Sequence, residues 1–203
     1  MAREAGPTDA VVTLLAPAKL NLGLTLLDRR PDGYHEIETI FLPLRLYDRL
    51  ELEPTDGPGI KLEGKFPPSV PRDATNLAVR AARTWEERVG VTLSLKIRLD
   101  KRIPAAAGLG GGSSDAASVI LGLEALFDTP LGGEECRALA RGLGADVPFF
   151  LSPTPALGRG VGDRMEPLEG LPEMWWVLAV FPFGLQTREI YREASIELTL
   201  PRQ

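Results

Sequence analysis

Hydrophobic and polar residues alternate strictly between Val91 and Leu99. Every second residue of this stretch is Val, Leu or Ile, and the residues between them are Thr, Ser, Lys and Arg. A period of two predicts a β-strand with one buried face and one face in water. Leu44, Leu46, Leu50 and Leu52 alternate likewise with Arg45, Arg49 and Glu51, and residues 11–15 and 20–27 are further strand candidates. The early part of the chain is therefore predicted to be mostly sheet, with a turn at Pro31-Asp32-Gly33.

Apolar residues at helical spacing follow. The first such segment carries Leu77, Ala78, Ala81, Trp85 and Val89 on one side. Asp73 or Thr75 can cap this predicted helix, and Gly90 ends it. A second helix is predicted from near Ser113 to the Asp128-Thr129-Pro130 turn, and a third covers about 134–143.

The order of these elements predicts the fold class. Strands come first, helices are mixed in later, and strict β-α-β alternation is missing, so we expect an α+β fold. Residues 152–172 are rich in Pro and Gly, with a turn at 159–163, and we place a domain boundary there, dividing the chain into 1–155 and 156–203. Residues 174–181 are apolar and predict a strand that is buried on both faces.

Composition narrows the functional classes. The chain has 203 residues, of which 44% are hydrophobic and 25% charged, values typical of a globular protein. A net charge of −5 argues against nucleic-acid binding, which relies on clustered Lys and Arg. No apolar run approaches the ~18 residues of a membrane span. The single cysteine, Cys136, has no partner for an internal disulfide, so we expect a cytoplasmic protein.

The sequence AGLGGGSSDAA at 107–117 places glycines and serines directly before a predicted helix. We call residues 104–112 the glycine loop. The first N–H groups of a helix are unpaired and carry partial positive charge, and glycines let the backbone approach an anion closely, so the loop predicts a phosphate site. No Gly-Lys-Ser or Gly-Lys-Thr occurs, which disfavours a P-loop. A dinucleotide site, with Asp128 on the ribose, and a flexible linker stay open as alternatives.

Three motifs together give a more specific indication. Pro17-Ala-Lys-Leu-Asn-Leu22, Pro104 to Ser114, and Gly144-Ala-Asp-Val-Pro-Phe149 resemble, in order and spacing, the superfamily of galactokinase, homoserine kinase, mevalonate kinase and phosphomevalonate kinase, the GHMP kinases. With the turn Asp32 to His35, the chain is most similar to the branch that acts on a cytidine diphosphate ester of methylerythritol. The resemblance covers about Leu15 to Tyr191.

The resemblance implies a fold and an activity. The fold would be a two-domain GHMP kinase, with an N-terminal domain like that of ribosomal protein S5 and a C-terminal α/β sandwich. The activity would be transfer of the γ-phosphoryl group of ATP, with Mg²⁺, to the 2-hydroxyl of the methylerythritol unit, in the non-mevalonate route to isoprenoid precursors. We expect a monomer or homodimer that binds no nucleic acid and no membrane.

Two residues are expected to be catalytic by this resemblance. Asp146 would accept the hydroxyl proton, and Lys19 would orient that carboxylate and neutralise charge on the moving phosphoryl group. Each has an alternative interpretation: Asp146 before Val-Pro can cap a helix, and Lys19 can be a solvated charge on a strand edge. Asn21 would donate a hydrogen bond to the acceptor substrate, or be an ordinary polar face residue.

The resemblance also assigns binding residues. On the cytidine substrate it places Tyr34 and Tyr191 on the faces of the base, His35 at its edge and Thr187 nearby. The nucleotide would be held by Asn76, Lys101, Pro104, Gly108, Gly110, Gly111, Gly112, Ser113 and Ser114, with Ser114 a candidate Mg²⁺ ligand. A capping role for Asn76 and a solvated role for Lys101 stay open.

Members of this superfamily are longer and carry a third, C-terminal glycine-rich motif. Nothing after Gly170 resembles that motif, so the second domain is expected to be incomplete. Two alternative functions follow: a homoserine- or mevalonate-type kinase, and an inactive nucleotide-binding form.

Overall fold

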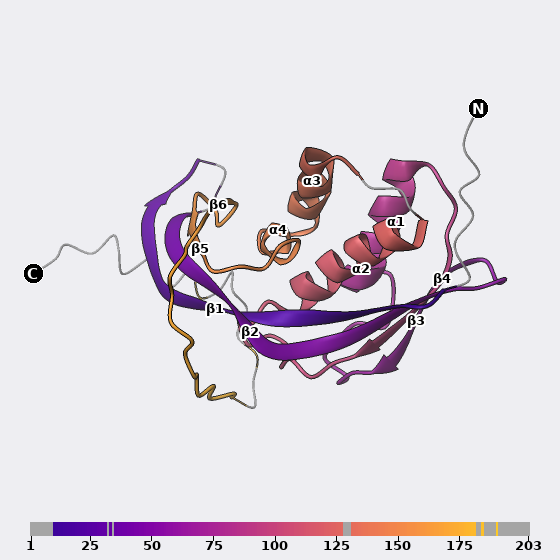
Figure 1. Ribbon diagram of the computed structural model, residues 1–203, viewed down its shortest axis with the longest axis horizontal. Helices are drawn as coiled ribbons and strands as arrows, with labels where there is room; N and C mark the ends of the chain where they lie inside the picture. The colour runs from indigo at the N-terminus through magenta and orange to yellow at the C-terminus, as the bar shows by residue number, and fades with distance from the viewer. Residues whose placement is uncertain are drawn as a thin grey trace, which may run out of the picture.

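The computed structural model describes residues 10–31, 33, 35–127, 131–181, 184 and 190. In this part of the chain, helices lie on one face of a six-stranded mixed sheet (Figure 1). The strands are β1 (Val12–Arg29), β2 (His35–Pro54), β3 (Gly59–Lys65), β4 (Ser94–Asp100), β5 (Ala156–Arg159) and β6 (Arg164–Pro167). The helices are α1 (Leu77–Val89), α2 (Gly111–Phe127), α3 (Gly133–Leu143) and α4 (Val147–Phe150). The predicted α+β class is confirmed.

Strand β2 organises the sheet. It pairs antiparallel with β1 from Val12–Leu52 to Arg29–His35, and with β4 and β5 on its other edge, in the order β3-β4-β2-β5-β6. The two strand candidates at 11–15 and 20–27 are thus one strand. Pro17 falls at a register shift, and such a bulge bends a strand without ending it. Strand β3, which the sequence pattern did not predict, runs parallel to β4 and is connected to it through α1.

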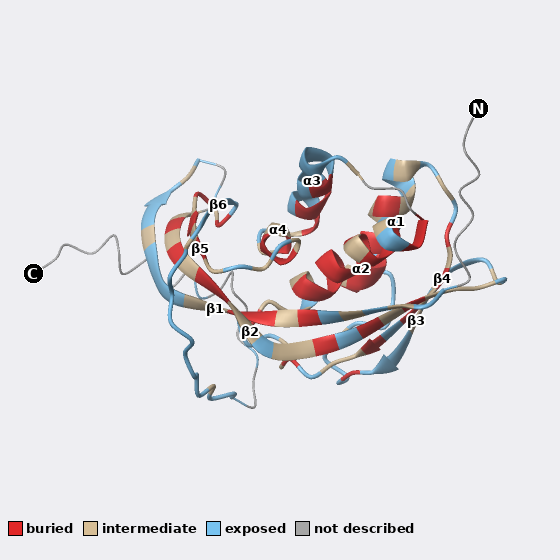
Figure 2. Ribbon diagram, viewed as in Figure 1, coloured by how far each residue is buried: buried red, intermediate tan, exposed pale blue. Residues whose placement is uncertain are grey.

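Helix α2 forms the centre of the core. Eleven of its residues are buried, so it is apolar around most of its circumference and lies between the sheet and the other helices (Figure 2). The strand predicted at 91–99 is confirmed as β4, which begins three residues later than predicted, and Leu93, Leu95, Ile97 and Leu99 are all buried beneath these helices. Within the described residues, no helix combines the length and the apolar character that a membrane span needs.

Helix α1 begins one residue later than the predicted caps allow. Its N-cap is Asn76, whose side chain accepts a 2.9 Å hydrogen bond from the N–H of Ala78, whereas Asp73 bonds Thr75. Gly90 ends the helix in the left-handed conformation at φ 76°, as predicted.

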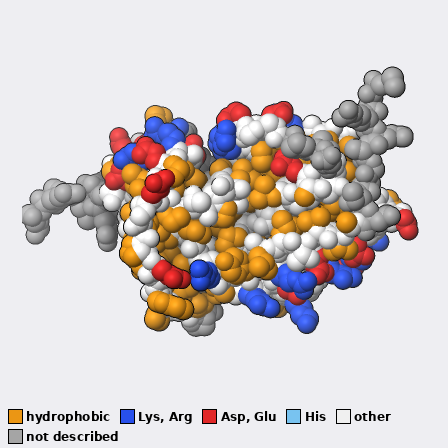
Figure 3. Space-filling view, viewed as in Figure 1, with side chains coloured by type: hydrophobic (Ala, Val, Ile, Leu, Met, Phe, Trp, Pro, Cys, Tyr) orange, Lys and Arg blue, Asp and Glu red, His pale blue; other side chains and the backbone are white. Residues whose placement is uncertain are grey.

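Residues 156–167 form a β-hairpin around the predicted turn, and β5 pairs with β2 at Thr39 to Phe41. The residues just after the expected domain boundary thus complete the same sheet. The prediction of a buried strand at 174–181 is wrong for the described structure: this segment has no regular secondary structure, and Trp175 and Val177 are 96% and 100% exposed. Among the described residues no strand pairs with it, and apolar side chains lie open along this side of the molecule (Figure 3).

Candidate functional site

The glycine loop connects the end of β4 to the start of α2. Three of its residues have positive φ: Ala106 at 53°, Gly108 at 72° and Gly110 at 70°. Helix α2 begins at Gly111, two residues before the expected Ser113, and its first helical bond runs from the N–H of Ser114 to the carbonyl of Gly110 at 2.9 Å. The preceding N–H groups therefore have no acceptor within the helix. Because Gly111 and Gly112 are helical, the flexible-linker alternative is wrong.

The glycine loop packs closely against Lys19. The backbone N–H of Lys19 on β1 donates to the carbonyl of Leu109 at 2.9 Å. A Cβ atom on Gly110 would lie 2.9 Å from Cγ of Lys19 and 2.7 Å from Cζ of Phe150 on α4. Glycine is therefore required at position 110, both by its positive φ and by the lack of space.

Lys19 and Asp146 form an ion pair beside the loop. The Lys19 Nζ atom lies 3.4 Å from Oδ2 of Asp146, and their side chains are 7% and 36% exposed. The burial of Lys19 excludes the solvated-edge alternative. Asp146 precedes α4 but makes no capping hydrogen bond. Its carboxylate pairs with Lys19 and is partly exposed to solvent, and it does not cap the helix.

A short series of hydrogen bonds fixes the position of the Lys19 ammonium. Lys19 donates to Oδ1 of Asn21, Asn21 Nδ2 donates to Oγ1 of Thr39 at 3.0 Å, and the Thr39 hydroxyl donates to the carbonyl of Gly23 at 2.7 Å. The ring of Phe41 lies 5.2 Å from Nζ of Lys19, which adds a cation–π contact.

Sequence reasoning missed Thr39. Its signal is visible in the pattern, because Thr39 is a polar residue between Ile37 and Phe41 on the buried face of β2. A threonine in such a position needs a hydrogen-bond partner, and here Asn21 and Gly23 supply two.

A second charged cluster lies behind the loop. Lys101 forms ion pairs with Asp48 of β2 and with Oδ2 of Asp115 of α2, the latter at 2.7 Å, and its side chain is 4% exposed. The solvated interpretation of Lys101 is therefore wrong, and neither aspartate was predicted. Burial raises the pKa of Asp115 to about 7, with the Asp48 carboxylate adding to the rise and Lys101 opposing it.

The remaining predicted nucleotide residues surround the start of α2. Asn76 caps α1, and its Nδ2 also donates to the carbonyl of Pro71 at 2.8 Å. Leu77, its neighbour, lies 3.4 Å from where a Cβ on Gly112 would be. The Oγ of Ser114 is buried without a partner in the described residues.

The predicted cytidine residues are only partly visible. His35 begins β2, next to the turn in which the N–H of Gly33 donates to the carbonyl of Arg30 at 3.0 Å. Tyr34, Thr187 and Tyr191 lie outside the described residues, as does Asp128 of the dinucleotide alternative.

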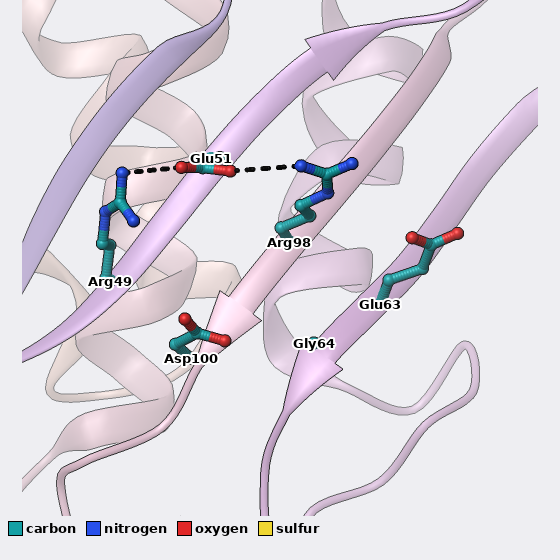
Figure 4. A pocket seen from close by; sticks show the side chains of 6 residues that line it. All are labelled: Arg49, Glu51, Glu63, Gly64, Arg98 and Asp100. Carbon is teal, nitrogen blue, oxygen red and sulfur yellow. Dashed lines mark ion pairs between the residues drawn. The ribbon is translucent and has the colours of Figure 1, made fainter.

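A shallow polar depression of about 170 Å³ lies elsewhere, on the outer face of the sheet (Figure 4). It is lined by Arg49, Glu51, Glu63, Gly64, Arg98 and Asp100. Glu51 bridges both arginines, at 2.7 Å to Arg49 and 3.6 Å to Arg98, so these charges neutralise one another. We interpret this depression as part of a solvated face.

The glycine loop, α1 and Asp146 fall within a known family model. Residues 76–153 match the GHMP kinases N terminal domain. The mixed sheet with helices on one face and the helix-start glycine loop thus place the chain in the GHMP kinase class.

Individual relatives are more specific. The chain is 47% identical, over 86% of its length, to the 4-diphosphocytidyl-2-C-methyl-D-erythritol kinase of Symbiobacterium thermophilum, of which it covers 61%. It is 43% identical over its whole length to the enzyme of that name from Desulfotalea psychrophila, covering 69%. A crystal structure of 4-(cytidine 5'-diphospho)-2C-methyl-D-erythritol kinase matches with a TM-score of 0.68 at 50% identity, over 79% of this chain and 56% of that chain. The chain belongs to the 4-diphosphocytidyl-2-C-methyl-D-erythritol kinase family, and it spans less than two thirds of the length of the first of these relatives.

Proposed function

We propose that this chain carries the ATP-binding and catalytic half of a kinase that phosphorylates 4-diphosphocytidyl-2-C-methyl-D-erythritol on its 2-hydroxyl, giving the 2-phosphate and ADP. The observation that carries this proposal is the Lys19–Asp146 ion pair, 3.4 Å apart, beside a glycine loop at a helix start. The homoserine- and mevalonate-type alternatives are not favoured, because relatives at 47 and 43% identity bear the diphosphocytidyl kinase name.

The proposed chemistry needs few protein groups. Asp146 accepts the proton of the 2-hydroxyl as its oxygen forms a bond to the γ-phosphorus, and the bond from that phosphorus to the bridging oxygen of ADP breaks. Lys19 holds the carboxylate in its ionised form and offsets the negative charge of the moving phosphoryl group. Asn21 keeps the ammonium in place by accepting its hydrogen bond, and Thr39 holds Asn21 by accepting a hydrogen bond from its amide.

The nucleotide phosphates would bind at the N–H groups of Gly111, Gly112 and Ser113, where an anion is favoured by the helix dipole. Pro104, Gly108 and Gly110 would shape the backbone that the phosphates approach. Asn76, just before α1, and Lys101, just after β4, would support this backbone.

The donor set is compatible with Mg²⁺ held mainly by phosphate oxygens. Among the described residues there is no cluster of three His, Cys, Asp or Glu side chains suited to a metal. Mg²⁺, however, usually keeps only one or two protein ligands beside substrate phosphates. The unpartnered Ser114 hydroxyl is the oxygen that would hold it. When bound, the ion would neutralise phosphate charge.

The cytidine end of the substrate would bind near the 31–35 turn. We propose that Tyr34 stacks on the base and His35 hydrogen-bonds its edge, with Tyr191 on the opposite face and Thr187 close by. The domain boundary near 155, a cytoplasmic location and a monomeric or dimeric state stay predictions.

The test is ATP consumption with and without 4-diphosphocytidyl-2-C-methyl-D-erythritol, together with direct binding of each ligand. Substrate-dependent ADP formation supports the proposal. Asp146→Asn should lower kcat by about 10² to 10⁴-fold and leave the Kd for ATP unchanged, because the carboxylate acts on the hydroxyl. The matched control is Asp56→Asn, an exposed carboxylate in a bend, which should change neither value. If the Kd for ATP rose with Asp146→Asn while kcat held, the proposed role of Asp146 would be refuted.

A further inference from the structure

Asp48 is a buried carboxylate that the proposed chemistry does not use. It is fully enclosed, at 0% exposure, on β2. Its Oδ1 accepts hydrogen bonds from the backbone N–H of Arg102 and, at 2.8 Å, of Ile103, and its Oδ2 bonds Lys101 Nζ. One side chain therefore ties the middle of the sheet to three consecutive residues at the entrance of the glycine loop.

Lys101 extends this link to the exit of the loop. Its ammonium also bonds Oδ2 of Asp115, in the first turns of α2, at 2.7 Å. Asp48, Lys101 and Asp115 thus close a bridge across the whole loop, which we call the loop clamp.

Backbone hydrogen bonds and the burial of Ile103 and Leu109 also hold the loop in place. Its two ends are held by Lys101 N–H to the carbonyl of Lys65 at 2.8 Å and by Leu109 to Lys19 at 2.9 Å. Three of its residues have positive φ. The two glycines adopt it readily, whereas Ala106 at 53° is strained and depends on the surrounding structure.

The clamp also contacts the first turn of α2, residues 111–113, which we call the phosphate-binding turn. A Cβ atom on Gly111 would lie 3.0 Å from Nζ of Lys101 and 3.0 Å from Cγ2 of Ile103. The first helical residue therefore rests on the two residues that Asp48 holds. A shift of Lys101 or Ile103 would move the N–H groups of this turn with it.

We propose that Asp48 is a positioning residue that, through Lys101 and the backbone of residues 102 and 103, sets the place of the glycine loop and of the phosphate-binding turn of α2. The identity of the ligand rests on the proposed function, but the effect of Asp48 on the position of the loop can be tested without any ligand. Asp48 has no contact with the nucleotide in this scheme and acts only through the loop.

The test is hydrogen–deuterium exchange of Asp48→Asn. The carboxylate accepts from the two N–H groups at Oδ1 and from Lys101 at Oδ2, whereas the amide has only one acceptor oxygen and cannot serve both. The variant keeps the Lys101–Asp115 pair, so no buried charge is left alone. We expect exchange in a peptide spanning 103–114 to become at least tenfold faster, with exchange in α3 unchanged.

The matched control is Asp56→Asn. Asp56 is an exposed carboxylate in a bend between β2 and β3, so its loss should not alter exchange in the loop. Equal acceleration in every peptide of Asp48→Asn, or an unchanged loop, overturns the inference. If Asp48→Asn yields no folded protein, Asp48→Glu tests the same bridge, because it keeps the buried carboxylate charge and moves its oxygens by one methylene relative to Lys101 and the two N–H groups.

ATP binding separates this inference from the proposed function. The Kd for ATP should rise at least tenfold in Asp48→Asn, and the Kd for the cytidine substrate should not change. If the wild-type protein bound no ATP, the proposed function would fail, and the exchange result would still decide whether Asp48 places the loop.

Discussion

At the residue scale, the position of Lys19 depends on groups that do not take part in the chemistry. A series of hydrogen bonds leads from Lys19 through Asn21 to Thr39, and Thr39 is 2% exposed. Thr39→Val keeps the shape but leaves the Asn21 amide and the Gly23 carbonyl without a partner. We expect this variant to lose about 1–3 kcal/mol of unfolding free energy and roughly tenfold in kcat.

The measurement is steady-state kinetics together with urea unfolding, and Thr39→Ser is the matched variant. Serine keeps the hydroxyl, so kcat should return to within about twofold of wild type. Equal kcat values for Thr39→Val and wild type would show that Asn21 holds Lys19 without help from Thr39.

At the element scale, the glycine loop combines a backbone requirement with a packing requirement. Gly108 and Gly110 have nearly the same φ, 72° and 70°, but a Cβ at 108 would meet nothing within 4 Å, whereas at 110 it would meet Phe150 at 2.7 Å. Gly108→Ala should therefore cost only the positive φ, about 1 kcal/mol of unfolding free energy. Gly110→Ala should cost about 1–3 kcal/mol more, because it also overpacks α4 and Lys19.

Urea unfolding of the two variants side by side checks this prediction. The pair shares the same substitution and the same backbone conformation, so the difference in unfolding free energy measures packing alone. Equal values for Gly108→Ala and Gly110→Ala would mean that α4 moves away at little cost and does not fix the loop.

Local patterns predicted the elements better than the site. The alternation in β4 and the Gly90 stop of α1 depend on neighbouring residues, and both were confirmed. The division of β1 into two candidates was wrong, because the register shift after Pro17 interrupts the pairing without ending the strand. Asp48 and Lys101 are 53 residues apart, and no local period reports such a contact. The Lys19 and Asp146 motifs and Asn21 were recognised, whereas Thr39 and Asp48 were not.

At the scale of the whole molecule, charge is distributed in two different ways. On the outer face of the sheet, Lys, Arg, Asp and Glu are interspersed and exposed (Figure 3), and such pairs contribute little to stability. The loop clamp instead places one ammonium between two carboxylates inside the protein. We therefore expect the stronger pH dependence of stability at the clamp, where the charges are buried.

The clamp gives the protein a specific pH dependence. Burial raises the pKa of Asp115 to about 7, above its ordinary value of 3.8, so the folded state binds this proton more tightly than the unfolded chain does. The resulting stabilisation is fully present below about pH 4 and is lost as the pH rises through about 7.

Asp115→Asn keeps an acceptor for Lys101 but has no proton to lose. Between pH 5 and 8, wild type should lose on the order of 2–4 kcal/mol of unfolding free energy relative to Asp115→Asn, measured by urea unfolding at both pH values. The comparison cancels the contribution of shared groups that lie away from the clamp. Parallel pH profiles would mean that Asp115 stays ionised across this range and that Lys101 outweighs its burial.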